Sequence, residues 1–408
     1  MSTLPLQGES VLARTGYWRF WCARVLSMAS FQIISVVIGW QIYALTGRAF
    51  DLGLVGLCQF LPMLALTIPA GHVADRYDRR LVVGLCQLAE AATAAGLAVA
   101  SFTGTLSPPV IFAAAAVVGA CRTFENPAMA ALLPALVGPA LLPRALALSA
   151  SAMQTATIVG PALGGLLYLA GPDAAYGVVA LFYAGASLLV RSLTMAATAP
   201  KREPPTIASL LSGFAFIRAK PVVLGAISLD MVAVLLGGAT ALLPIYAHDV
   251  LQTNSIGLGV LRAAPAVGAL LTSLVLARYQ MQRQVGLKMF IAVGVFGLAT
   301  IVFGLSTWFW LSLVALVAMG AADVVSVVIR STLVQLETPD GMRGRVSAVN
   351  SMFIGTSNQL GEFESGMTAA LFGAVPAVVL GGIGTVLVAL IWSRLFPALR
   401  RIDAMPGQ

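Results

Sequence analysis

Charged side chains are scarce in this sequence. Asp, Glu, Lys and Arg make up only 10% of its 408 residues, whereas a typical soluble domain carries about 25%. Histidine occurs twice, and the four cysteines stand singly inside apolar runs, at Cys22, Cys58, Cys86 and Cys121. Their spacing matches neither a disulfide framework nor a metal site, so we expect small buried side chains and no metal.

Sequence motifs of several enzyme classes are also missing. The chain has no G-x-x-x-x-G-K-[ST] loop, no nucleophile elbow and no H-E-x-x-H, which are the motifs that cradle phosphate, present a catalytic serine or bind zinc. We therefore expect no enzyme, no cofactor and no direct use of ATP as an energy source.

Long apolar runs are abundant instead. Hydrophobic residues make up 59% of the chain, and its mean hydropathy is +0.92. A helix needs roughly 20 apolar residues to cross a bilayer, and backbone polar groups in lipid must be satisfied within the segment. We therefore predict an all-α polytopic membrane protein with twelve transmembrane helices, at residues 20–45, 53–73, 81–102, 109–133, 145–169, 174–194, 222–247, 255–277, 287–305, 308–334, 346–371 and 374–395.

Basic residues between these segments gather on one side of the predicted membrane. With a cytoplasmic N-terminus, at most Arg48 and Arg262 lie near the outer side. The positive-inside rule then places both termini in the cytoplasm. This placement also argues against a nucleic-acid partner, although the net charge is +8. The cytoplasmic residues are Arg14, Arg19, Arg76, Arg79, Arg80, Arg144, Arg191, Lys201, Arg202, Arg218, Lys220, Arg278, Arg283, Lys288, Arg343, Arg345, Arg394, Arg400 and Arg401.

A polar connection in the middle of the chain divides the segments into six and six. We predict an N-terminal bundle in 1–195, a cytoplasmic linker with a short amphipathic helix in 196–221, and a C-terminal bundle in 222–408. The halves resemble each other, since "RALALSASAMQTATIVGPALGG" matches "RVSAVNSMFIGTSNQLGEFESG". Duplicated helix bundles are typical of membrane transporters.

The loop "GHVADRYDRR", residues 71–80, concentrates charge between two apolar segments. With "WQIYALTG", "GPALGG" and "RGRVSAVNS" it resembles the major facilitator superfamily over the whole chain. Asp78 stands where the family pattern has glycine, which is similar to a branch of siderophore and macrolide exporters. The resemblance implies two six-helix bundles, a monomer and a bacterial inner membrane location. The signature residues are Gly71, Asp75, Arg76, Arg79 and Arg80.

This loop is a candidate conformational latch. Arg79 and Arg80 can fold back toward Asp75 or toward the end of a neighbouring helix, where cations are favoured. A contact made in only one conformation biases the equilibrium by its differential energy. The alternative is that the arginines only set the topology. In the second half Ala277 replaces the acid before Arg278, so we expect the latch mainly in the N-terminal half.

Ionisable residues inside apolar segments are candidates for proton or substrate handling, because their burial in lipid is costly. Arg122 and Glu125 share a helical face and are expected to pair. The resemblance associates an arginine of helix four with proton transfer, and a structural ion pair is the alternative. The resemblance implies that helices one, four, seven and ten line a central cavity. Asp230, on helix seven, is expected as an unpaired acid that could take up and release a proton, and a capping or packing role is the alternative. Asp323, on helix ten, has the same status. Arg330 is expected to pair with Asp323 or with a loop acid.

A further polar cluster lies in "SNQLGEFESG" on helix eleven. Glu362 and Glu364 are two apart and do not share a face, so at most one points at the cavity. Glu90 is expected to contact a neighbouring helix.

Helices five and one carry two further candidate features. "AMQTATIVGPALGG" resembles the antiporter motif of the family, which implies export, and generic packing is the alternative. Its small residues allow close helix approach, and its proline allows a bend. Gln32, Trp40 and Gln41 are expected to line the cavity. The motif residues are Gly160, Pro161, Gly164 and Gly165.

These expectations combine into a secondary active transporter that exports a siderophore or an amphipathic drug-like molecule in exchange for protons. One alternative is an importer of a small metabolite, or a lipid translocator, on the same fold. Another is a transport-inactive sensor or scaffold. The sequence leaves the identity and the charge of the substrate open.

Overall fold

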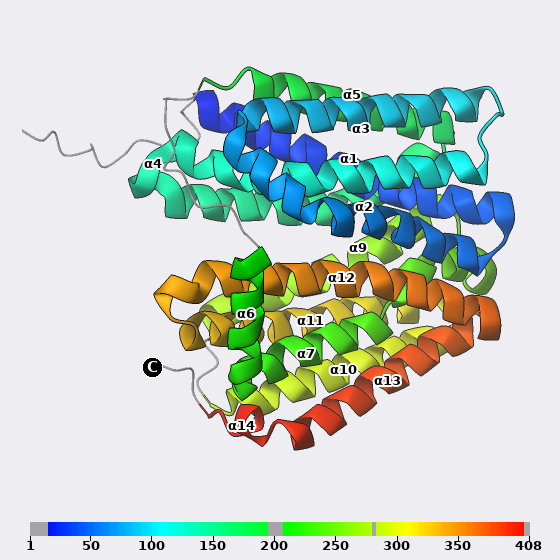
Figure 1. The fold of residues 1–408 in the computed structure, drawn as a ribbon. Coiled ribbons are helices and arrows are strands. Elements are labelled where there is room, and N and C mark those ends of the chain that lie inside the picture. The colour runs from blue at the N-terminus through cyan, green and yellow to red at the C-terminus, as the bar shows by residue number, and fades with distance from the viewer. Residues whose placement is uncertain (1–14, 195–206, 280–282, 404–408) are drawn as a thin grey trace, which may run out of the picture.

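The computed structural model describes residues 15–194, 207–279 and 283–403. Every regular element in these ranges is helical. A short helix, α6 (Ile207–Ala219), runs across one end of the bundle (Figure 1). The helices before it form a first group: α1 (Thr15–Thr46), α2 (Ala49–Arg76), α3 (Arg79–Phe102), α4 (Pro108–Tyr168) and α5 (Pro172–Arg191).

The second group begins with a broken helical segment, made of α7 (Pro221–Leu236), the 3-10 turn η2 (Ala239–Leu242), α8 (Leu243–Ile245) and the π-helical turn η3 (Tyr246–Val250). It continues with α9 (Ser255–Arg278), α10 (Val285–Leu305), α11 (Phe309–Glu337), α12 (Asp340–Phe372), α13 (Ala374–Leu395) and α14 (Pro397–Arg400).

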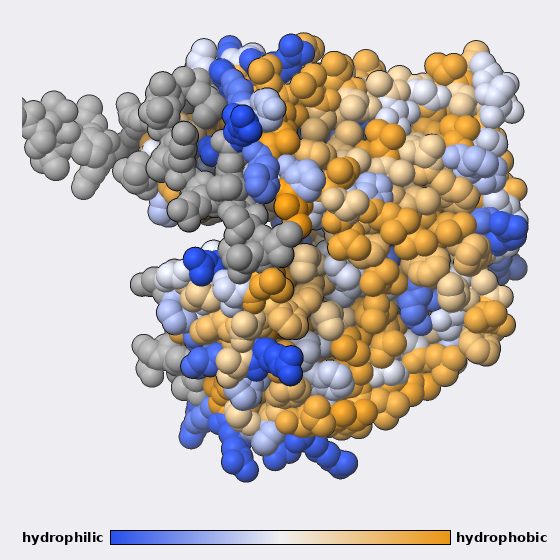
Figure 2. Space-filling view, in the orientation of Figure 1, coloured by the Kyte–Doolittle hydropathy of each residue, from blue (hydrophilic) through white to orange (hydrophobic). Residues whose placement is uncertain are grey.

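Among the described residues, eleven helical segments are long and apolar enough to cross a membrane. Apolar side chains cover most of the flank of the bundle between its two ends (Figure 2). The remaining predicted segment, α12, falls short because polar and charged residues lower its hydropathy. It nevertheless packs against α2, α7 and α13 as a full member of the bundle. The predicted all-α polytopic architecture is confirmed, and α12 is held there by its neighbours.

The segment predicted at 222–247 is long and apolar enough to cross a membrane, as Pro221–Val250, but it is not one continuous helix. Helix α7 ends at Leu236, and Gly237 and Gly238 lead into η2. A Cβ atom on Gly238 would lie only 2.6 Å from the carbonyl oxygen of Gly361 in α12. The glycine therefore lets the two backbones approach closely. Irregular backbone within a membrane is tolerated where it is buried in protein or lines a cavity.

Helix α4 contains two of the membrane-crossing segments, Pro108–Gly138 and Leu141–Tyr168. Gly138 separates them, with φ 72° and ψ 171°. Only glycine adopts this backbone region readily, so Gly138 ends the first segment and lets the chain turn back.

The bundle has two different ends. We call the end with α6 the linker end, and the opposite end, with turns at Gly47, Gly171 and Gly373, the closed end. At the closed end one apolar cluster contains residues of both groups, such as Ile33 and Leu258. At the linker end each group has apolar clusters of its own.

Close helix crossings join the two groups toward the closed end. Helices α2 and α12 meet at Gly53 and Gly366, where a Cβ atom on Gly366 would overlap the α2 backbone. Helices α4 and α9 meet where Ser255 Oγ donates a 2.8 Å hydrogen bond to the carbonyl oxygen of Gly165. Figure 2 shows the surface hollowed between the groups on the side of the linker end. The structure is therefore closed at one end and open at the other.

Replacing Gly138 with alanine is expected to lower the thermal unfolding midpoint in detergent. A non-glycine residue at these angles is strained by about 1–3 kcal/mol, although a Cβ atom there would meet no other atom within 4 Å. The matched control is Gly177→Ala in the regular helix α5, where a Cβ atom also has open space. Equal midpoints for the two variants would contradict the assigned backbone strain.

Candidate functional site

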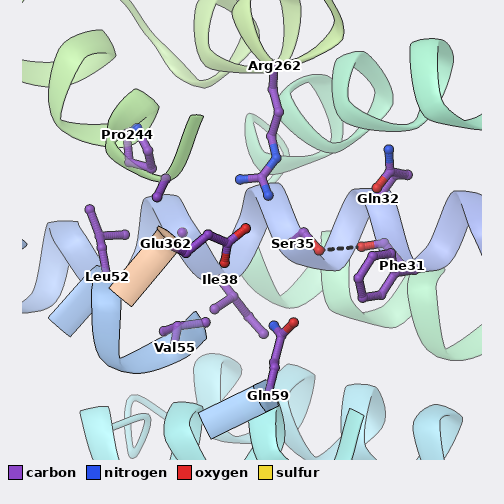
Figure 3. Close-up of a pocket in the computed structure, with 12 residues that line it drawn as sticks. Phe31, Gln32, Ser35, Ile38, Leu52, Val55, Gln59, Pro244, Arg262 and Glu362 are labelled. Atoms are coloured by element: carbon purple, nitrogen blue, oxygen red, sulfur yellow. Dashed lines mark hydrogen bonds between the residues drawn. The ribbon is translucent and has the colours of Figure 1, made fainter. Parts of the chain in front are cut away.

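A central cavity of about 220 Å³ lies between the two helix groups (Figure 3). Helices α1 and α2 contribute one wall, and η2, α8, α9 and α12 contribute the other. The lining combines apolar side chains with a few polar ones, as in most small-molecule sites. The lining residues are Phe31, Gln32, Ser35, Ile38, Gly39, Leu52, Val55, Gln59, Ala241, Pro244, Arg262 and Glu362.

A second cavity, of about 180 Å³, lies within the second helix group. The broken segment lines it at Gly237 and Gly238, and α11 contributes Asp323. Glu362 lines both this cavity and the central one. Asp323 lines this cavity and forms no ion pair within 4.0 Å with any described residue.

Asp230 and Arg330 form a buried ion pair, which corrects two expectations. Asp230 Oδ2 lies 3.2 Å from Arg330 Nη2, and the two side chains are 8% and 3% exposed. Arg330 Nη1 also donates a 3.1 Å hydrogen bond to Asn350 Oδ1 on α12. Asp230 is therefore not the unpaired acid expected from the sequence, and Arg330 does not pair with Asp323. Helix α7 brings Asp230 to Arg330, a long-range contact that the spacing within α11 could not reveal.

Arg122 and Glu125 pair within α4, as their spacing predicts. Arg122 Nη1 lies 3.3 Å from Glu125 Oε2. Ser27 Oγ and Gln87 Nε2 donate hydrogen bonds of 2.7 and 2.8 Å to Glu125 Oε1. The guanidinium also lies over the ring of Phe31, 4.4 Å from its centroid. This network ties α1, α3 and α4 together beside the central cavity, and any role in proton transfer stays a prediction.

Glu90 is the most completely buried acid among the described residues. Its side chain is 0% exposed, and neither carboxyl oxygen has a hydrogen-bond partner among the described residues. It lies on α3 and lines none of the cavities described above. Its expected contact with a neighbouring helix stays a prediction.

Three other candidates lie away from the central cavity. Glu364 accepts a 2.8 Å hydrogen bond from Thr368 on its own helix and lines neither cavity. Gln41 is buried and donates a 3.4 Å hydrogen bond to Ser101 of α3. Trp40 packs against Tyr168 at the closed end. Gln41 is nine residues beyond Gln32, which places it on the opposite face of the helix at 3.6 residues per turn. Of the predicted lining residues, only Gln32 lines the cavity.

The glycine motif of the second α4 segment forms close contacts on two sides. A Cβ atom on Gly160 would lie 2.6 Å from Cβ of Gln32, and one on Gly164 would lie 3.2 Å from Cα of Ile33. Gly165 and Pro161 face α9. The expected close helix approach is confirmed, and it joins both α1 and α9 to this segment. The association with export stays a prediction.

The charged loop makes its described contacts within the first helix group. Asp78 accepts a hydrogen bond from the backbone N–H of Arg80 at the start of α3 and forms a 2.6 Å ion pair with the Arg80 guanidinium. This guanidinium lowers the pKa of the Asp78 carboxyl below its usual range. Arg80 also donates to the carbonyl oxygen of Leu193, and Arg79 donates to that of Ala131 in α4.

The remaining signature residues, Gly71, Arg76 and Asp75, lie at the end of α2. Gly71 lies in the last turns of α2, and Arg76 is its exposed last residue. The side chain of Asp75 lies outside what the structure describes, so its part in a latch stays a prediction. Asp78, which departs from the family pattern, is the acid that Arg80 contacts.

Arg262 was missed by the reasoning from sequence. The distribution of basic residues places Arg262 near the outer side, yet its side chain reaches the central cavity from α9 (Figure 3). The available signal was its position two helical turns inside an apolar segment that begins at Ser255.

Two groups of membrane-crossing helices, joined at one end around a charged central cavity, are the architecture of a membrane transporter. Residues 20–362 match the family model of the Major Facilitator Superfamily. The chain belongs to this family, which confirms the resemblance seen in the sequence.

Comparison with individual proteins agrees with this assignment. The chain is 28% identical over 390 residues to the enterobactin exporter EntS of Shigella boydii serotype 18, covering 95% of this chain and 93% of that exporter. A bacterial homologue of the human lysosomal transporter Spinster, in an inward-facing and occupied conformation, superimposes with a TM-score of 0.76 at 15% identity, over 96% of this chain and 99% of that one. The nucleoside transporter NupG superimposes with a TM-score of 0.70 at 14% identity, over 93% and 98%. At such identities the two structures show a shared fold.

Breaking the Asp230–Arg330 pair is expected to destabilise the protein. Asp230→Leu or Arg330→Met alone leaves one buried charge without its partner, which costs about 3–5 kcal/mol. The double variant Asp230→Leu/Arg330→Met should recover most of this loss, because no uncompensated charge remains. The unfolding free energy in detergent measures all three. Single variants as stable as the unmodified protein would show that the pair is not formed.

The charge of Asp78 is expected to stabilise the protein in a pH-dependent way. The pKa of this carboxyl is lowered in the folded protein, so its contribution is present above the unfolded value of about 3.9 and is lost as pH falls through the folded value. Asp78→Asn keeps an oxygen that can cap α3 but loses the charge. The unmodified protein should therefore have the higher thermal midpoint at neutral pH, and this difference should disappear in strong acid. A constant difference would contradict this.

Proposed function

We propose that the chain is a proton-coupled exporter of a siderophore or an amphipathic drug-like molecule across a bacterial inner membrane. The observation that supports this best is the central cavity between the helix groups, whose lining is apolar except for a few polar residues and the charges of Arg262 and Glu362. The similarity to the enterobactin exporter over nearly the whole chain supports the class of cargo and the direction.

Transport would follow the alternating-access scheme, in which two bodies rock about the central cavity. We take residues 1–195 and 222–408 as these bodies, with 196–221 as the cytoplasmic linker. If the positive-inside rule holds, the linker end faces the cytoplasm, and the structure represents an inward-facing conformation. The crossings at Gly53 with Gly366 and at Gly165 with Ser255 must then separate for the outer side to open.

Proton exchange is assigned to acids that line the cavities. Asp323 and Glu362 are each accessible to a cavity and form no described ion pair. Asp230 is held by Arg330, so its protonation would have to accompany the loss of that pair. In this scheme the charged loop of residues 71–80 stabilises the first helix group and acts as a latch during the change of conformation.

The proposed function is tested by transport into inside-out membrane vesicles. A labelled catecholate siderophore and a labelled macrolide should accumulate in energised vesicles that contain the protein, and an uncoupler should abolish the accumulation. Asp323→Asn should reduce transport to the uncoupled level, because the amide cannot take up a proton at neutral pH. Glu337→Gln, on the same helix but outside both cavities, is the matched control.

Two outcomes would contradict the proposal. Accumulation that persists unchanged with the uncoupler would exclude proton coupling. Accumulation in right-side-out vesicles only would reverse the direction and favour an importer.

A further inference from the structure

Arg262 and Glu362 are the two charged side chains of the central cavity, and they point toward each other across it (Figure 3). Arg262 extends from α9 and Glu362 from α12. Among the described residues, no ion pair within 4.0 Å involves either side chain. Neither side chain forms a hydrogen bond with another described residue. The cavity therefore holds a cation and an anion that face each other with neither directly satisfied.

The surrounding backbone keeps both charges in the cavity. A Cβ atom on Gly56 would lie 2.9 Å from Oε2 of Glu362, so glycine leaves room there for the carboxylate. A Cβ atom on Gly39 would lie 3.8 Å from Nη1 of Arg262, which places the guanidinium directly over α1. Both charged groups thus lie at the junction of the two helix groups.

A guanidinium in such a place has a definite ligand preference. It carries five N–H donors and no acceptor, and it binds oxyanions in a bidentate, charge-assisted geometry. A polar group that is removed from water without a partner is costly, so a ligand that offers only apolar surface would leave Arg262 unsatisfied. Gln32, Gln59 and Ser35 offer neutral hydrogen bonds, and Phe31 offers an apolar ring.

We propose that the central cavity binds an organic acid, with Arg262 holding its carboxylate or phenolate oxygen. Glu362, which faces Arg262 without pairing with it, then accepts a hydrogen bond from an N–H or O–H group of the same ligand. The volume of about 220 Å³ is below the roughly 300 Å³ at which pockets for drug-sized ligands begin. The cavity therefore holds the acidic end of the ligand, while the apolar remainder extends into the neighbouring space.

This inference rests on the proposed function only for the identity of the cargo, because binding to the purified protein needs neither a proton gradient nor export. Three fluorescent probes with the same aromatic group suit the test. Dansylglycine carries a carboxylate, dansylglycinamide replaces it with a neutral amide, and dansylcadaverine carries an amine. Their dissociation constants are measured by fluorescence anisotropy with the full chain in a non-ionic detergent.

We expect dansylglycine to bind about tenfold more tightly than dansylglycinamide, the factor expected for a charge-assisted hydrogen bond. Dansylcadaverine should bind most weakly. Arg262→Gln should remove the preference for the acid, and Arg262→Lys should retain part of it. Glu362→Gln should strengthen the binding of dansylglycine, because it removes a carboxylate that repels the carboxylate of the probe in the same cavity. A misfolded variant cannot bind more tightly, so this opposite effect separates the proposal from a loss of structure.

Arg278→Gln, the same substitution at an exposed position of the same helix, is the control and should bind all three probes as the unmodified protein does. Equal affinity of the unmodified protein for the three probes would overturn the proposal, as would an undiminished preference for dansylglycine in Arg262→Gln. Either result alongside uncoupler-sensitive export would leave the proposed function intact. If the protein discriminates between the probes but shows no proton-driven export, the proposed function is refuted and the inference about ligand binding stands.

Discussion

The cost of placing an ionised side chain in an apolar membrane interior organises this structure. Each charged residue there needs a partner or access to a polar cavity. Arg122 pairs with Glu125 in the first helix group, and Asp230 pairs with Arg330 in the second. Among the charges left without an ion pair, Arg262, Glu362 and Asp323 lie at the cavities, where a ligand, a proton or water can satisfy them. Glu90 is the exception, since it is buried on α3 without a described partner. The same constraint that limits charge in the sequence therefore marks the place where transport chemistry can occur.

The glycines toward the closed end solve a second problem, which is how two helix bundles can touch closely at one end and part elsewhere. At Gly53 with Gly366 and at Gly165 with Ser255, the absence of a side chain lets the backbones meet. Contact between two backbones buries little apolar surface for each residue. Such a crossing therefore defines how two helices pack without a large hydrophobic interface. At the linker end, separate apolar clusters leave the two groups apart. A structure closed on one side of its cavity follows from this difference.

In the charged loop of residues 71–80, the residue that departs from the family pattern makes structural contacts. The acid at Asp78 begins α3 and pairs with Arg80. Arg79 also donates to the carbonyl oxygen of Ala131 within α4, and Arg80 donates to that of Leu193, just beyond the end of α5. These contacts join the start of α3 to α4 and to the residues that follow α5.

Composition, local sequence runs and spacing within one helix are enough to predict the membrane-spanning architecture, the loop motif, the family and the Arg122–Glu125 pair. The sequence could not determine that Asp230 reaches Arg330, that Trp40 and Gln41 turn away from the cavity, or that two glycines break the seventh segment beside α12. It also placed Arg262 at a membrane surface. Those features depend on which helices, far apart in the sequence, pack against each other and through which faces. A single helix taken alone does not indicate which of its faces will be buried, so these contacts become visible only when the helices are packed together.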